Sequence, residues 1–340
     1  MITRRELLCN TLLGAMSVAG ISSLRGQQKV ADQGLIMTVR GPVPVERLGF
    51  ILSHEHVLVD FIGARDTGYH RWDREDVVHV MTPKLAAVKA AGFDTLFECT
   101  PAWLGRDPRL LVRLSEATGL HIVTNTGYYG ARQNRFLPAH AMTASPESLA
   151  EEWIAEWERG IEDTGVKPGF IKIGLDEGPL SDVHKRLVRA AAIAHRKTGL
   201  AIVSHTGGGP GVFEALDVLA DEGVAADAFI WVHAQGEQDT QRHVVAARRG
   251  CWISLDGVQD DNAAQYVENI LALREAGLLH KILISQDAGW YEPETKGNST
   301  FRSYLSIRSV LIPLLKESGV TDREVKKLLH DNVVDAFRTA

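Results

Sequence analysis

Eight short apolar runs recur along the chain between residues 50 and 285, and they constrain its fold more than any other feature. Continuous apolar runs of this length are typical of parallel strands that are buried on both faces. Between them lie segments whose apolar residues have helical spacing, most clearly 147–163, 181–199 and 241–250. This alternation predicts a (β/α)8 TIM barrel. The runs are FILSH, TLFECT, HIVTNT, FIKIG, AIVSH, FIWVH, WISLD and ILIS.

An open, doubly wound sheet is the alternative fold for the same alternation. Such a sheet normally carries a GxGxxG fingerprint after its first strand, and none follows FILSH. The glycine cluster GGGPG at 207–211 follows the fifth run, where we expect it to leave room for a substrate loop. No short-period repeat or low-complexity linker divides the chain, so we expect residues 27–340 to form one barrel domain.

The first 26 residues resemble an export signal. Arg4 and Arg5 in TRRELL precede the apolar stretch LLGAMSVAGI, and Ser17 and Ala19 are small residues suited to cleavage. The apolar stretch is too short to span a bilayer comfortably. We therefore expect residues 1–26 to be a twin-arginine signal peptide and the mature protein to be periplasmic or secreted, with no membrane span. A ragged cytosolic N-terminus is the alternative.

Charge and cysteine content bear on the possible partners and ligands. The net charge is −6 and no basic block occurs, so we do not expect a nucleic-acid partner. Cys9 lies in the predicted signal, whereas Cys99 and Cys251 lie in or beside apolar runs. Neither of these two has a metal-type cysteine spacing, and we expect both to be buried as small apolar residues.

Two histidines close the first apolar run. In a strand, residues two apart face the same way, so His54 and His56 are expected to point together into the barrel mouth. The carboxyl ends of the strands are where barrel enzymes keep their chemistry. Two imidazoles on one face suit a borderline metal such as zinc. For a single histidine, the alternative is a hydrogen-bonded position in the core.

A lysine lies inside the fourth run. Ile171 and Ile173 flank Lys172, so the strand is expected to be buried with the lysine facing the barrel interior. A bare ammonium there is costly, and a depressed pKa is one remedy. Reaction with carbon dioxide is another, because the carbamate is an anionic ligand whose two oxygens can bridge two cations. A lysine paired with a carboxylate and a Schiff-base lysine are the alternatives.

Three further side chains complete the set. His205 and His233 close the next two runs and are expected to hold a second metal ion. Asp287 follows the last run, where a carboxylate on a metal can also accept a proton from water. A helix N-cap is the alternative role for Asp287. We predict two divalent ions, for which zinc is the first choice, and we take His233 and Asp287 as catalytic candidates.

The order of these residues resembles the phosphotriesterase family of the amidohydrolase superfamily. The likeness extends from about residue 40 to the C-terminus and includes GRDP at 105–108, TGYY at 126–129 and SQDAGW at 285–290. It implies a binuclear metal-dependent hydrolase that cleaves an ester-type bond in a lactone, carboxylic ester or phosphotriester, and a homodimer. It also implies the ligands: His54, His56 and Asp287 for one ion, His205 and His233 for the other, with carboxylated Lys172 and a hydroxide bridging the two.

Two positions depart from the family pattern. Gly236 falls where family members place a relay acid, and Glu237 or Asp239 are the nearby acids. Family lactonases pair a tyrosine, matched here by Tyr129, with an arginine after the seventh strand, and ISLDGVQDD has none. The alternative functions are an amidase or deaminase of the same superfamily and a metal-binding protein that has lost catalysis.

The loops after the strands are expected to line a largely apolar pocket. Two arginines in GARQNRF, Arg132 and Arg135, have the chemistry to bind a phosphate or carboxylate, and a solvated loop is the alternative. The predicted substrate contacts are the aromatic residues Tyr129, Trp103 and Trp290, with Tyr128 and Phe136 as further candidates. For each of them, simple packing within its loop is the alternative.

Overall fold

The computed structural model describes residues 34–297 and 301–338. The predicted signal peptide, residues 1–26, lies outside the described residues and stays a prediction. The described chain begins with a hairpin of two antiparallel strands, β1 (Leu35–Thr38) and β2 (Gly41–Pro44). A backbone hydrogen bond from the Val39 amide to the Ile122 carbonyl ties this hairpin to the third barrel strand.

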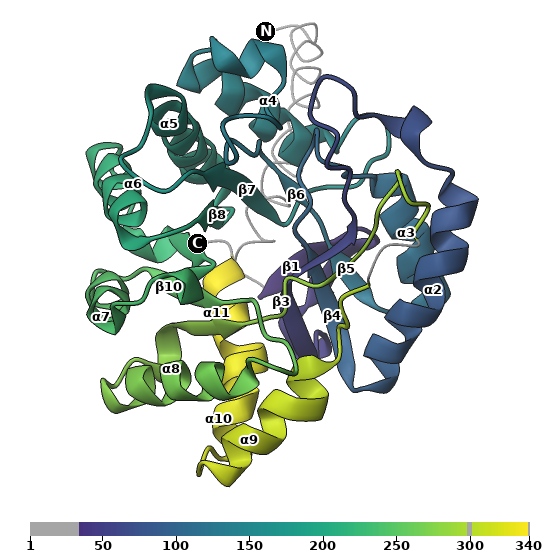
Figure 1. The fold of residues 1–340 in the computed structure, drawn as a ribbon. Coiled ribbons are helices and arrows are strands. Elements are labelled where there is room, and N and C mark those ends of the chain that lie inside the picture. Colours follow the sequence, from purple (N-terminus) through teal and green to yellow (C-terminus); the bar gives the residue numbers. More distant parts are fainter. Residues whose placement is uncertain (1–33, 298–300, 339–340) are drawn as a thin grey trace, which may run out of the picture.

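The strands that follow form a parallel sheet with helices outside it (Figure 1). One set of pairings runs from β3 through β4 to β5, and another runs from β6 through β7, β8, β9 and β10 to β11. Strand β6 continues β5 after a break at Thr124, so the two sets form one surface. The strands are β3 (Phe50–Leu58), β4 (Phe93–Glu98), β5 (His121–Val123), β6 (Asn125–Thr126), β7 (Phe170–Leu175), β8 (Ile202–Thr206), β9 (Phe229–Val232), β10 (Trp252–Leu255) and β11 (Ile282–Ile284).

The sheet closes on itself between β11 and β3. The His54 amide donates to the Ser285 hydroxyl at 2.9 Å, and the Asp287 amide donates to the His54 carbonyl at 3.1 Å. A short strand, β12 (Gly289–Tyr291), then pairs in parallel with the end of β3. These contacts close a (β/α)8 barrel, which confirms the predicted fold class.

The helices cover the outer face of the barrel (Figure 1). Their ends follow local sequence signals. Ser145 caps α4 by accepting from the Ser148 amide, and Gly160, with φ of 94°, ends it earlier than the predicted 163. The helices are α2 (Arg74–Ala90), α3 (Pro108–Thr118), α4 (Pro146–Arg159), α5 (Asp182–Thr198), α6 (Gly209–Asp221), α7 (Thr240–Arg248), α8 (Ala263–Glu275), α9 (Ile312–Glu317), α10 (Asp322–Lys326) and α11 (Asn332–Phe337), with π-helical turns at Ile307–Leu311 and Lys327–Asp331.

The amino-terminal half of the barrel interior is filled by apolar side chains. The ring centroids of Phe97 and Phe337 lie 4.3 Å apart, so helix α11 packs against this end of the barrel. Phe170 packs against both rings. Cys99 and Cys251 are buried free thiols, as expected from their apolar surroundings. Because this end is packed solid, open space for chemistry remains at the carboxyl end of the strands.

Candidate metal centre

A register shift in β3 decides which of its side chains face the cavity. Ile51 packs in the interior cluster, so strict alternation would send Ser53 and Glu55 inward and the two histidines outward. The pairing of β3 with β4 shifts between Leu52 and Glu55. This irregularity reverses which side chains of the strand face inward, so His54 and His56 line the cavity.

Asp287 lies against both of these histidines. Its Oδ1 is 3.0 Å from His56 Nε2 and 3.6 Å from His54 Nε2. One ligand atom from each of the three residues falls within 4.8 Å of the others. Strand β11 ends three residues earlier, and the next element is β12, so the helix N-cap alternative for Asp287 is wrong.

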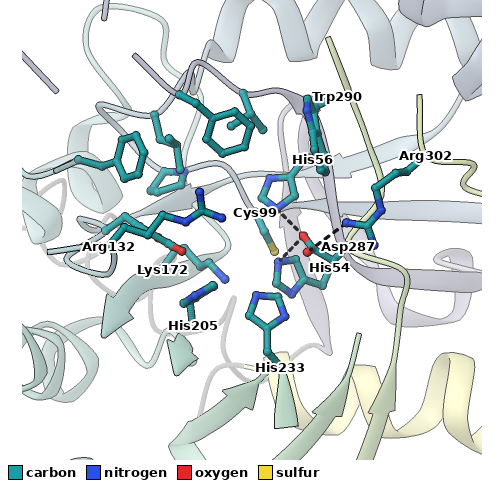
Figure 2. Close-up of a pocket in the computed structure, with 16 residues that line it drawn as sticks. His54, His56, Cys99, Arg132, Lys172, His205, His233, Asp287, Trp290 and Arg302 are labelled. Atoms are coloured by element: carbon teal, nitrogen blue, oxygen red, sulfur yellow. Dashed lines mark ion pairs between the residues drawn. The ribbon is translucent and has the colours of Figure 1, made fainter. Parts of the chain in front are cut away.

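The remaining predicted ligands lie on the opposite side of the same cavity (Figure 2). The ring centroids of His205 and His233 are 4.3 Å apart, and those of His233 and His54 are 5.2 Å apart. Lys172 projects between them from β7. The structure therefore places all six predicted ligands around one cavity, although they come from five strands or strand ends.

Lys172 is the most unusual member of the set. The residue is 1% exposed, and among the described residues its Nζ atom has no hydrogen-bond partner. A buried nitrogen without an acceptor is costly, and native proteins rarely tolerate one without a ligand or a modification. The side chain thus fits a lysine whose nitrogen is carboxylated and whose new oxygens contact cations.

The ionisation of the other side chains also fits a pair of divalent cations. Burial lowers the pKa of His54 to about 4 and that of His205 well below its ordinary value, so both imidazoles are neutral and can ligate. Burial alone would raise the pKa of Asp287. The hydrogen bond from His56 and the histidine charges outweigh burial and hold this pKa below its ordinary value. Burial would also lower the pKa of His233, but the neighbouring Asp256 carboxylate outweighs burial and raises it. A donor set of imidazole nitrogens and a carboxylate oxygen suits zinc and related ions.

Asp256 is a site residue that the sequence analysis missed. It follows β10 and is fully buried. Its carboxylate accepts from Nδ1 of His54 at 3.0 Å and from Nδ1 of His233 at 2.7 Å. These bonds fix the tautomer of both rings, with the proton on Nδ1. The lone pair of each Nε2 is then available to bind a metal ion. The available signal was its place at the end of the run WISLD.

A second buried carboxylate supports the loop that carries Asp287. Glu55 accepts from the Ser285 hydroxyl at 2.8 Å and from the backbone amides of Gln286 and Ala288 at 3.0 and 2.8 Å. Burial raises the pKa of Glu55 to about 8, although these bonds oppose the shift. The side chain faces away from the cavity, so its role is to hold the loop in place.

The predicted substrate contacts separate into two cavities. Tyr129, Phe136 and Trp290 line the metal-ligand cavity, which has a volume of about 190 Å³. Trp103 does not, which corrects the prediction for that residue. Its backbone is left-handed, with φ of 67°, the residue is 40% exposed, and it lines a neighbouring cavity together with Tyr128.

The two arginines of GARQNRF also separate. Arg132 lines the metal-ligand cavity, whereas Arg135 points to the outside, where its Nη2 donates to the Ile62 carbonyl. Arg302, which the sequence analysis did not single out, lines the cavity from the other side. Its Nη1 atom lies 3.7 Å from Oδ2 of Asp287. The predictive signal for Arg302 was weak, because it lies far beyond the last apolar run.

Gly236, the position at which the family pattern places a relay acid, has free space around it. A Cβ atom added at Gly236 would meet nothing within 4 Å. The nearby acids are already used: Glu237 accepts from the Gly209 amide and from Arg242, both at 2.9 Å, and Asp239 caps α7. Neither carboxylate lines the cavity.

No helix in the described ranges is long and apolar enough to cross a membrane.

Known proteins resemble this chain in sequence and in fold. A sequence model of the phosphotriesterase family matches residues 34–337. The phosphotriesterase homology protein of Mycobacterium tuberculosis (strain ATCC 25618 / H37Rv) is 33% identical over 311 residues, covering 87% of this chain and 95% of the relative. The N-acetyltaurine hydrolase of Rattus norvegicus is 25% identical over 348 residues, covering 88% and 96%. A mutant of organophosphorus hydrolase from Deinococcus radiodurans has a similar solved structure, with a TM-score of 0.78, 26% identity and coverage of 89% and 96%.

Proposed function

The chain belongs to the phosphotriesterase family and is a metal-dependent hydrolase, and we propose that it cleaves an ester-type bond in a lactone, carboxylic ester or phosphotriester. The observation that carries this proposal is the buried nitrogen of Lys172, which has no hydrogen-bond partner in residues 34–297 and 301–338 and lies among four imidazoles and Asp287. A donor set of this kind is suited to two divalent ions, of which zinc is our first choice.

In this proposal, His54, His56 and Asp287 would hold one ion, His205 and His233 would hold the other, and carboxylated Lys172 would supply oxygen ligands to both. When bound, the ions would act as Lewis acids on the scissile bond and lower the pKa of the attacking water.

The chain's own side chains orient the ligands and handle the proton. Asp256 holds the rings of His54 and His233 with Nε2 toward the cavity. Asp287 is ionised and beside both histidines of β3, where it can accept the proton of the attacking water. Its carboxylate is 24% exposed, so we propose that the proton leaves directly to solvent and needs no acid at position 236.

The walls of the cavity select the substrate's apolar part. Tyr129 packs against His205 with ring centroids 4.9 Å apart, and Trp290 packs against His56 at 6.0 Å. Phe136 lies against Tyr129. We propose that these rings hold the group next to the scissile bond and limit the access of water from the side.

Amide hydrolysis is the second candidate function. It is favoured by the relative named for N-acetyltaurine hydrolysis, since the same constellation would serve an amide. A deaminase and a catalytically degenerate metal-binding protein are weaker alternatives, and the intact set of six ligands opposes the latter.

A matched screen tests these functions. The zinc-loaded protein is assayed on 4-nitrophenyl acetate, 4-nitroacetanilide, a simple γ-lactone and a diethyl aryl phosphotriester, and metal content is measured on the same sample. We expect ester or lactone turnover with two ions per chain. Turnover of the anilide alone would replace the ester proposal by amide hydrolysis, and two bound ions without any turnover would support a binding protein.

Two further proposals concern the whole protein. The twin arginines at positions 4 and 5 support export of the mature protein to the periplasm or medium. Family resemblance supports a homodimer, and the mass of the native protein in solution tests it.

A further inference from the structure

A strained turn lies at the mouth of the cavity. Arg132, Gln133 and Asn134 have φ values of 58°, 58° and 61°, so three consecutive residues with side chains adopt the left-handed conformation. This conformation is unfavourable for L-residues, and it persists only where the surroundings impose it. Strain of this kind is concentrated at ligand-binding and active sites.

The surroundings that impose the turn are identifiable. The carboxylate of Asp176, which directly follows β7, accepts from the backbone amides of Arg132 at 2.6 Å and Gln133 at 3.0 Å. The Asn134 amide donates to the Gly130 carbonyl at 3.1 Å. The turn is therefore anchored to the same strand that carries Lys172, and the anchor uses the backbone of Arg132, leaving its side chain free.

The side chain of Arg132 points to the cavity. Figure 2 shows its guanidinium on the cavity side, above Lys172. The guanidinium lies 5.6 Å from the ring centroid of Phe61, and Arg132 lines the cavity together with Tyr129. Among the ion pairs of the described residues, none involves Arg132, whereas Arg302 on the other side is paired with Asp287.

The charges at the cavity mouth favour an anion. Asp287 is the one carboxylate in the described lining, and Arg302 already faces it. The guanidinium of Arg132 makes no ion pair within the described residues, although the Asp176 carboxylate lies against its backbone amide. Tyr129 lines the cavity beside Arg132, and a phenol hydroxyl is a hydrogen-bond donor for the same ligand.

We propose that Arg132, with Tyr129 beside it, is a subsite for an anionic oxygen group on the substrate, remote from the scissile bond. The group is a carboxylate, phosphate or sulfonate, all of which match the fork of a guanidinium. Asp176 is a positioning residue for this subsite. The inference rests on the proposed hydrolase function and narrows its substrate class to ester-type compounds with an anionic tail.

A kinetic comparison tests the subsite. The substrates are 4-nitrophenyl acetate and mono-4-nitrophenyl succinate, which share the leaving group and differ in the charge of the acyl tail. We expect wild type to prefer the succinate, and Arg132→Ala to raise KM for the succinate alone by about ten-fold or more, as loss of a charged hydrogen bond implies. Arg132→Lys should restore part of the preference. The matched control is Arg135→Ala, because Arg135 belongs to the same loop but lies outside the cavity.

A binding measurement separates this inference from the proposed function. Phenylacetate, phenylphosphonate and phenylmethanesulfonate are titrated calorimetrically into the zinc-loaded protein, with phenylacetamide as the uncharged match. We expect Arg132→Ala and Asp176→Ala to weaken binding of at least one anion about ten-fold, and Arg135→Ala to leave it unchanged.

The anion whose binding depends on Arg132 identifies the group. Equal anion binding by wild type, Arg132→Ala and Arg135→Ala would overturn the inference even if esters are hydrolysed. If wild type hydrolyses neither ester, the proposed ester function fails, and the titration still decides the anion subsite.

Discussion

The substitution Asp256→Asn probes how the fold orients the candidate ligands. The carboxylate of Asp256 is fully buried and accepts from Nδ1–H of His54 and His233 and from the Ser254 hydroxyl, at 3.0, 2.7 and 2.8 Å. An amide of the same shape has one acceptor oxygen and one NH2 donor. At least one of the buried donors would therefore face another donor.

The structure sets the expected size of the effect. A hydrogen bond to a charged group contributes about 1.5–3 kcal/mol, and breaking a buried charged pair costs about 3–5 kcal/mol because the partner stays buried. We expect Asp256→Asn to lower the free energy of unfolding by about 3–5 kcal/mol. The rings of His54 and His233 also lose their fixed orientation, so metal affinity should fall about 10- to 100-fold, the effect typical of residues that orient ligands.

Two assays measure these effects separately. Denaturant unfolding of chelator-treated protein reports stability, and competition with a chelator reports metal affinity. The matched control is Asp260→Asn, the same chemical change at an exposed position after the same strand, with an expected effect within about 0.5 kcal/mol. The reasoning is refuted if Asp256→Asn matches this control in both assays. If Asp256→Asn does not fold, Ser254→Ala removes one hydrogen bond to the ionised carboxylate and should cost about 1.5–3 kcal/mol.

Further predictions concern the site, the leader and the loop that carries Asp287. Lys172→Ala should lose most bound metal and activity, and short-chain carboxylates should partly restore both; active wild type with fewer than two ions by elemental analysis would contradict this. Asp287→Asn should lower kcat about 100-fold or more with a far smaller loss of metal, and near-normal kcat would remove its role as a base. Replacing both arginines of TRRELL by lysine should retain the precursor in the cytosol, and normal export and processing of that variant would exclude the twin-arginine signal. A Cβ at Gly289 would lie 2.0 Å from the Tyr304 hydroxyl, whereas one at Gly277 meets nothing within 4 Å. Both glycines have positive φ, so Gly289→Ala should destabilise the protein by about 1–3 kcal/mol more than Gly277→Ala in denaturant unfolding.

The sequence alone determined the fold class and the strand ends that carry the chemistry. Apolar runs and helical spacing are local patterns, and burial on both faces of a parallel strand leaves little choice of residue type. The carboxyl ends of parallel strands must meet at one face of a barrel. For that reason, residues as distant as His54 and Asp287 could be assigned to one site from their positions in the runs.

The tertiary structure decided which side chains reach the cavity and how they are held. The register shift in β3 turns His54 inward, which simple alternation from Ile51 does not predict. Asp256 was missed because an acid at a strand end shows its partners only when the histidines are seen beside it.

Loop residues depend still more on distant contacts. Trp103 and Arg132 both have left-handed backbones, yet Trp103 turns away from the cavity and Arg132 toward it. The direction of Arg132 is set by Asp176, which lies 44 positions along the chain. Local propensity describes the preferences of a loop residue, whereas its final conformation is imposed by partners that only the folded chain brings together.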